Sequence, residues 1–152
     1  ERTFLLSSTY GAEMSSLAAF IETVKVYEEE NVHCHLTDYG TRLIAGANKI
    51  SKDLGILDYF YFEGFPQSPC YVSKNKKGES CYKMRTLFNQ EMIKHNIIMP
   101  WVAISYAHKT EHLEKTLLAL KSSLSVYKEG LLNADKYLIN NDIQMPVFRK
   151  FN

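Results

Sequence analysis

The stretch that decides the fold lies near the middle of the chain and consists of Leu57-Asp58-Tyr59-Phe60-Tyr61-Phe62-Glu63-Gly64-Phe65. Aromatic side chains favour extended backbone, so this stretch predicts a β-strand. Pro66 and the residues after it interrupt the pattern, and Cys70-Tyr71-Val72-Ser73 resumes an extended run. A polar turn at residues 74–80 follows. We therefore expect a small antiparallel sheet with a hairpin centred near Gly78.

Apolar residues at spacings of three and four flank this stretch on both sides, which is the period of an α-helix. The expected helices cover about residues 13–30, 35–54, 83–95 and 110–131. The last helix has the clearest pattern, and its apolar positions are Leu113, Leu117, Leu120, Leu124, Tyr127 and Leu131. Thr110 is its expected N-cap. Gly40 and Gly46 lie inside the second helix and each should weaken it by about 1 kcal/mol relative to Ala.

A short strand is expected from Trp101 to Tyr106, and an irregular tail from about Asp135 that includes Pro146. No internal repeat and no linker is visible. The pattern predicts an α+β fold in which a small antiparallel sheet packs with about four helices. We expect residues 1–152 to form a single domain.

Composition limits the classes of function. The chain has 152 residues, and its 18 basic and 17 acidic side chains give a net charge of +1, which favours neither a nucleic-acid partner nor an anionic membrane surface. No apolar run approaches the roughly 20 residues that span a bilayer. Three cysteines without a CxxC pair predict reduced thiols in a cytoplasmic protein. The chain starts at Glu1 on the strand-like Arg2–Leu6, and we expect it to be a piece of something longer.

Residues 7–13 are the most informative for chemistry. Their sequence is Ser7-Ser8-Thr9-Tyr10-Gly11-Ala12-Glu13, directly before the first expected helix. Free backbone N–H groups, hydroxyl donors and the positive end of the helix dipole suit a phosphate or a carboxylate. The simpler alternative is that a Ser or Thr here only caps the helix. Neither of the two glycine-rich nucleotide-binding loops is present.

Other candidate sites receive less support. His33-Cys34-His35, and His108 with His112, suggest zinc ligands, but no second thiol pair and no HExxH accompanies them, so no metal site is predicted. No GxSxG is present, and packing is the expected role of Cys70. Arg85 could bind a carboxylate or serve a structural role. We therefore predict no catalytic residue in this chain.

Four stretches together resemble the C-terminal portion of class III, fold-type I, pyridoxal-phosphate-dependent aminotransferases, and most of all the glutamate-1-semialdehyde 2,1-aminomutase-like branch. They occur in the order and spacing of that family and extend over nearly the whole chain. The four stretches are Leu6–Glu13 with Leu17-Ala18-Ala19, Leu43–Asn48 with Leu54-Gly55, Arg85–Met92 running to Pro100, and Ser105–Thr110 with Leu113, Thr116 and Leu117.

The resemblance implies a parent enzyme that holds pyridoxal phosphate on a lysine and moves an amino group. It also implies that this chain is the small C-terminal domain and that the lysine belongs to an N-terminal large domain outside it. The chain alone should then be inactive. The implied partners are that large domain, a second subunit in a homodimer, and a small amino-acid-like or keto/aldehyde substrate, with no nucleic acid and no membrane.

One site residue can be carried over from the resemblance. In the family, a hydroxyl of the loop before the helix contacts the cofactor phosphate of the neighbouring subunit. Counting back from Gly11 assigns this role to Ser8, whereas the Tyr-Gly pair assigns it to Thr9. Both residues stay as cofactor-binding candidates. The resemblance and the free N–H groups before the first expected helix both place a phosphate at residues 7–13.

Two further hypotheses belong to other classes. The chain could be a stand-alone, non-catalytic α+β module that binds another protein, which the absence of the cofactor lysine would explain. It could also be a cytosolic metalloprotein that uses His33, Cys34 and His35. The amino donor, the pathway and the choice between transamination and intramolecular amino-group transfer stay open at this point.

Overall fold

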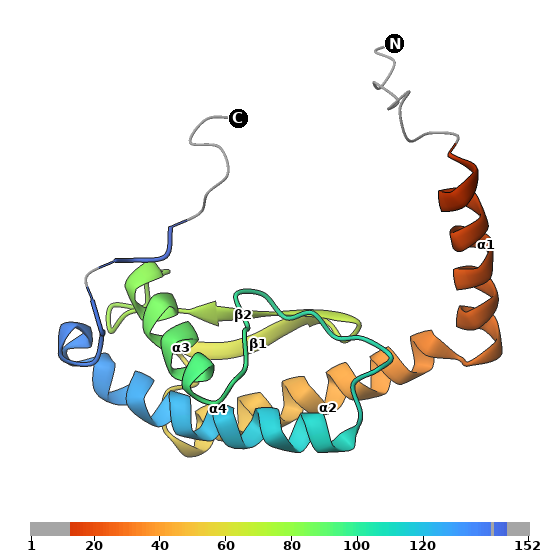
Figure 1. The fold of residues 1–152 in the computed structure, drawn as a ribbon. Helices are drawn as coiled ribbons and strands as arrows, with labels where there is room; N and C mark the ends of the chain where they lie inside the picture. The colour runs from red at the N-terminus through yellow and green to blue at the C-terminus, as the bar shows by residue number, and fades with distance from the viewer. Residues whose placement is uncertain (1–12, 141, 146–152) are drawn as a thin grey trace, which may run out of the picture. The chain divides into compact units, whose positions relative to one another are not determined.

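The computed structural model describes residues 13–140 and 142–145 (Figure 1). The chain divides into two compact units, residues 1–35 and residues 36–152, and each is described by itself. The single domain expected from the sequence stays a prediction. Ser8 and Thr9 lie outside the described residues.

The first unit contains the helix α1, Met14–Glu29, and the start of α2. The apolar spacing of Met14, Leu17 and Ile21 correctly predicted α1. Glu13 is its N-cap residue, and its carboxylate accepts hydrogen bonds from the hydroxyls of Ser15 and Ser16 at 3.0 and 2.9 Å. Asn31, with φ of 49°, separates α1 from α2 in a conformation that Asn tolerates better than most residues.

The second unit contains most of the regular structure. Its elements are α2 (Val32–Asp53, which begins in the first unit), β1 (Phe60–Phe65), β2 (Ser68–Ser73), α3 (Tyr82–Lys94), α4 (Thr110–Gly130) and the 3₁₀ helix Ala134–Lys136. Within the described residues, four α-helices and a two-stranded antiparallel sheet make the fold α+β, as the sequence predicted (Figure 1).

Aromatic residues of the hairpin form the centre of the core. Phe60 is fully buried, and its ring centroid lies 4.6 Å from that of Phe88 in α3 and 5.3 Å from that of Tyr127 in α4. The Tyr127 hydroxyl donates to the Lys74 carbonyl at 2.6 Å and accepts the Lys74 N–H at 3.0 Å. Burial raises the pKa of Tyr127 well above its ordinary value, so the phenol stays neutral and can make both bonds. These contacts join the hairpin to both helices.

The hairpin turn was predicted in the wrong place. Phe65 pairs with Ser68, so the two strands are joined at Pro66 and Gln67 and not near Gly78. Proline has a fixed φ that suits a tight turn, and here it connects the strands instead of separating two independent segments. The turn at Gly78 leads only to an isolated bridge between Lys74 and Ser80 before α3 begins.

The strand predicted from Trp101 to Tyr106 is also absent. These residues carry no strand assignment, and α4 begins at Thr110 with Lys109 as its N-cap. Among the residues that the structure describes, no backbone–backbone hydrogen bond involves residues 98–104. Because a strand exists only when it is paired, the β-rich sequence here stays without regular structure.

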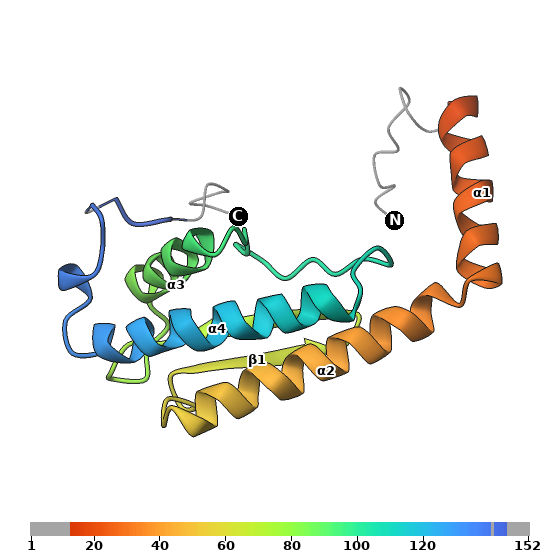
Figure 2. The same ribbon diagram turned by 60° about the horizontal axis from the view of Figure 1, so that its bottom comes forward.

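The glycines of α2 mark close contacts. A Cβ at Gly40 would lie 1.7 Å from the Pro66 carbonyl oxygen, and a Cβ at Gly46 would lie 2.7 Å from a methyl carbon of Leu117 in α4. Figures 1 and 2 both show α2 and α4 on the same side of the hairpin. The sequence analysis treated these glycines as weak points of a helix, whereas in the structure they let α2 approach its neighbours.

The side chain of Asn48 in α2 hydrogen-bonds backbone groups at the free edge of β1, where no further strand pairs among the described residues. Its side-chain amide donates to the Phe62 carbonyl at 2.9 Å, and its carbonyl oxygen accepts the Phe62 N–H at 2.7 Å. We expect Asn48→Ala to lower the free energy of unfolding by about 2 kcal/mol, because two half-buried backbone groups lose their partners. Urea denaturation followed by far-UV circular dichroism measures the change.

Lys49 supplies the matched control for this prediction. It is the next residue of the same helix, and its ammonium pairs with Asp53 at 3.2 Å between two side chains that are largely exposed. Lys49→Ala should change stability by less than about 0.5 kcal/mol. Equal effects of the two substitutions would show that the bonds of Asn48 to Phe62 contribute no special stability.

Candidate functional site

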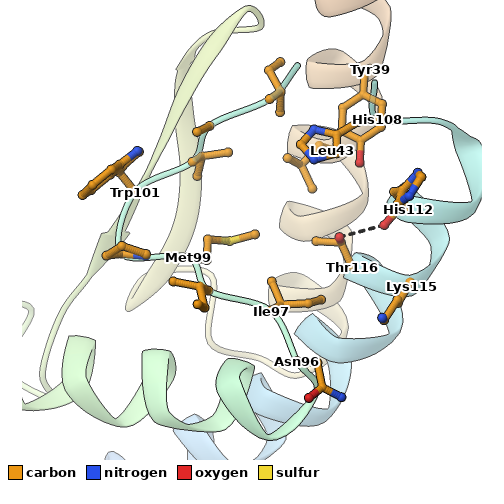
Figure 3. Close-up of a pocket in the computed structure, with 15 residues that line it drawn as sticks. Tyr39, Leu43, Asn96, Ile97, Met99, Trp101, His108, His112, Lys115 and Thr116 are labelled. Atoms are coloured by element: carbon orange, nitrogen blue, oxygen red, sulfur yellow. Dashed lines mark hydrogen bonds between the residues drawn. The ribbon is translucent and has the colours of Figure 1, made fainter. Parts of the chain in front are cut away.

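A pocket of about 520 Å³ opens at the surface of the second unit, between α2, α4 and the segment that connects α3 to α4 (Figure 3). Tyr39 and Leu43 of α2 line one side. The residues from α4 and its approach are His108, His112, Lys115 and Thr116, and residues 96–104 form the remaining wall. A volume of this size is typical of small-molecule pockets.

The two histidines lie at one end of the pocket beside Tyr39. The ring of His108 stacks on that of Tyr39 with 5.7 Å between centroids, and it lies 5.9 Å from the ring of His112. His108 thus lies beside His112 although it precedes α4. Burial raises the pKa of the Tyr39 hydroxyl, with Arg42 opposing the shift, so the phenol is neutral.

Backbone hydrogen bonds fix the orientation of both imidazoles. Nδ1 of His108 accepts the N–H of Ser105 at 3.1 Å, and Nδ1 of His112 accepts the N–H of Lys109 at 3.0 Å. In the neutral imidazole the proton is then on Nε2. His112 thus satisfies the N-cap amide of α4, a role that Glu or Gln usually takes.

The rest of the wall is apolar. Met99 and Val102 are buried, and in Figure 3 Trp101 projects away from the end where Tyr39 and His108 lie. Among the described residues that line this pocket, none carries a carboxylate, and Lys115 is the one Lys or Arg. The nearest carboxylate to His112 is that of Glu111, 3.9 Å from Nδ1. The pocket is therefore suited to an apolar group and presents neither a serine nor a cysteine as a nucleophile.

Arg85 has a structural role. Its guanidinium lies 5.2 Å from the ring centroid of Tyr71 and donates a hydrogen bond to the Pro100 carbonyl. The Tyr71 hydroxyl donates to the carbonyl of Met99 at 3.0 Å. Burial raises the pKa of Tyr71, and the charge of Arg85 offsets part of the shift. Of the two roles that the sequence left open, the structure shows Arg85 in contacts that hold the segment after α3.

The other sequence-predicted candidates are not brought together. Ser8 and Thr9 lie outside the described residues, so their phosphate role stays a prediction. Cys34 lies 3.3 Å from His33, and among residues 13–140 and 142–145 no group of three or more side chains could hold a metal ion. No helix in this part of the chain is long and apolar enough to cross a membrane.

Sequence reasoning did not find the pocket. Tyr39 entered the sequence analysis only as a position within the helix expected at residues 35–54, and residues 101–104 only as part of a strand. Lys115 was not singled out. The one signal in the sequence was the apolar run Ile97-Ile98-Met99-Pro100-Trp101-Val102 ahead of His108.

Comparison with known proteins gives one informative similarity. No family model matches the chain, and no solved structure matches it. The chain is 28% identical over 129 residues to the 3-aminobutyryl-CoA aminotransferase of Cloacimonas acidaminovorans (strain Evry). The match covers 83% of this chain but 31% of that protein, so the chain spans about a third of the length of its curated relative. This similarity supports an aminotransferase relationship.

Proposed function

We propose that this chain is the C-terminal domain of a pyridoxal-phosphate-dependent aminotransferase. The observation that carries the proposal is the similarity to an aminotransferase over 83% of the chain. This similarity agrees with the four stretches of sequence that resemble class III aminotransferases. The 31% coverage of the relative fits a domain whose remaining enzyme lies elsewhere in a longer polypeptide.

The geometry of the described family-like stretches supports a scaffold role. Leu43 of α2, Phe88 of α3 and Leu113 of α4 come from three of these stretches, and all three are buried in one core. These three side chains serve packing. The chain would therefore supply a rigid support, part of the pocket wall and subunit-contact surface, while the lysine that binds the cofactor belongs to the large domain.

The cofactor contact would come from the loop before α1. A Ser8 or Thr9 hydroxyl, together with the free N–H groups at the helix N-terminus, suits a dianionic phosphate. Pyridoxal phosphate itself would supply the electron sink for amino-group transfer. The family pattern implies that this loop serves the neighbouring subunit, so the proposal includes a homodimer of the longer protein.

The substrate class is a finer part of the proposal. The curated relative is named for 3-aminobutyryl-CoA, whereas the family-like stretches resemble the glutamate-1-semialdehyde aminomutase branch. Both names describe amino compounds with a carbonyl group, which is a thioester in one and an aldehyde in the other. We propose an amino-acid-like or keto/aldehyde substrate, with transfer between molecules or within one as an isomerase, in the cytoplasm.

The test uses the longer gene product that contains this chain. We expect Ser8→Ala or Thr9→Ala to lower the affinity for pyridoxal phosphate about tenfold, since one charge-assisted hydrogen bond contributes about 1.5 kcal/mol. The other substitution of the pair should have a much smaller effect. Absorbance titration of the apoprotein with the cofactor measures both affinities.

Ser15→Ala is the matched control, because its hydroxyl donates to the Glu13 carboxylate within α1 and should not face the cofactor. Wild-type affinity in both loop variants would contradict the phosphate role. A gene product without cofactor binding that captures another protein would favour the second candidate, a non-catalytic interaction module.

A further inference from the structure

The segment Ile98-Met99-Pro100-Trp101-Val102-Ala103-Ile104, here called the open segment, joins α3 to α4 beside the pocket (Figure 3). It is made of apolar residues and proline, and three of its last four residues, Trp101, Val102 and Ile104, favour strands. From residue 101 to residue 105 the side chains are exposed, buried, exposed, half-buried and exposed. This period of two is the pattern of a strand with one face on a core.

The backbone of the open segment has the hydrogen-bonding groups of a strand without a partner. Within residues 13–140 and 142–145, no backbone–backbone hydrogen bond reaches residues 98–104. The carbonyls of Met99 and Pro100 accept hydrogen bonds from the Tyr71 hydroxyl and from Arg85, which fix the start of the segment. Among the described residues, the N–H and C=O groups of residues 101–104 have no backbone partner, and every other one of these residues could pair with an added strand.

The exposed side of the segment also lacks the charged side chains that usually keep an unpaired strand edge from aggregating. Proteins usually protect such edges with charged side chains, above all lysine. The open segment has no charged residue, and Ile98 and Trp101 are 82% and 72% exposed. An exposed apolar strand edge next to an apolar pocket is typical of a surface that another protein segment covers permanently.

We propose that residues 101–104 pair with an apolar β-strand from another part of the same longer polypeptide, and that a side chain of this strand fills the pocket beside Leu43 and Val102. This is strand addition, in which main-chain bonds give affinity and the pocket gives selectivity. The inference rests on the proposed function for the source of the strand, because the match leaves most of the relative's length without a counterpart here.

Hydrogen exchange measured by mass spectrometry tests the proposal on this chain and on the longer gene product. The alternate amides of residues 101–104 that point toward the added strand should exchange at least about a hundredfold more slowly in the longer product, since pairing protects them. The turn at residues 75–79 is the internal control and should exchange alike in both. Fast exchange of residues 101–104 in a longer product that binds pyridoxal phosphate would overturn this inference and leave the proposed function intact.

A substitution gives a second readout. Ala103→Pro removes one backbone N–H that no described contact uses, so the stability of this chain should not change. In the longer product the same substitution should restore fast exchange at the paired amides that remain among residues 101, 102 and 104, because proline disrupts the strand pairing. Slow exchange in this chain that grows with concentration, together with a dimeric mass, would identify a second copy as the partner and refute the proposal. The absence of any longer gene product would refute both this inference and the proposed function.

Discussion

Phe60→Ala should lower the free energy of unfolding by about 4 kcal/mol, which is in the range measured for truncated core aromatics. Phe60 is fully buried, and its ring contacts those of Phe62, Tyr71, Phe88 and Tyr127. Its removal leaves a cavity between the hairpin and two helices that cannot collapse without moving all three. Urea denaturation followed by far-UV circular dichroism measures the loss.

Phe65→Ala is the matched control in the same strand. Phe65 is 80% exposed at the end of β1, so its truncation should cost less than about 0.5 kcal/mol. If Phe60→Ala were no more destabilising than Phe65→Ala, the aromatic cluster would not be the centre of the core.

Gly40→Ala should destabilise the fold by about 3 kcal/mol, although alanine is the better helix former. The added methyl group would lie 1.7 Å from the Pro66 carbonyl oxygen and 2.6 Å from its carbon, and both are backbone atoms. The hairpin turn would have to move away from α2, which would also strain the bond from Gln67 to Thr37 at 2.6 Å. The same denaturation measurement applies.

Substitutions at two other glycines separate the clash with backbone atoms at Gly40 from a clash with a side chain and from backbone strain. At Gly46 the obstacle is the side chain of Leu117, which can rotate, so Gly46→Ala should cost less than Gly40→Ala. Gly55 has φ of +71° with no atom within 4 Å of the added Cβ, so Gly55→Ala measures backbone strain alone, about 1 kcal/mol. A Gly40→Ala variant as stable as the wild type would mean that the turn at Pro66 is not held against α2.

Local pattern was sufficient to predict the helices and the fold class. The spacing of Leu113, Leu120 and Leu124 in α4 depends only on which face of one helix is buried, and that information is contained in the sequence. The hairpin turn could not be predicted in this way, because Pro66 fits both a break between segments and a tight turn within one. The choice between them depends on the pairing of Phe65 with Ser68, which is a tertiary contact.

The candidate site was less predictable because its residues are distant in sequence. Tyr39, His108 and His112 meet only when α2 and α4 pack, and no spacing rule connects residue 39 to residue 108. Residues 101–106 show a different reason why prediction from sequence fails. Their composition predicts a strand, but strand formation requires a partner, and a sequence pattern cannot supply one. Ser8 and Thr9 lie outside the described residues, so their role depends on experiment.

The position of Trp101 decides what intrinsic fluorescence can report for this chain. It is the one tryptophan in 152 residues, and it is 72% exposed on the open segment, outside the aromatic core. Its emission should change little when the core around Phe60 is lost, so a fluorescence melt would miss much of the unfolding. The same indole would shift its emission to shorter wavelength whenever the open segment is covered. The chain therefore has a built-in optical probe for the pairing proposed at the open segment.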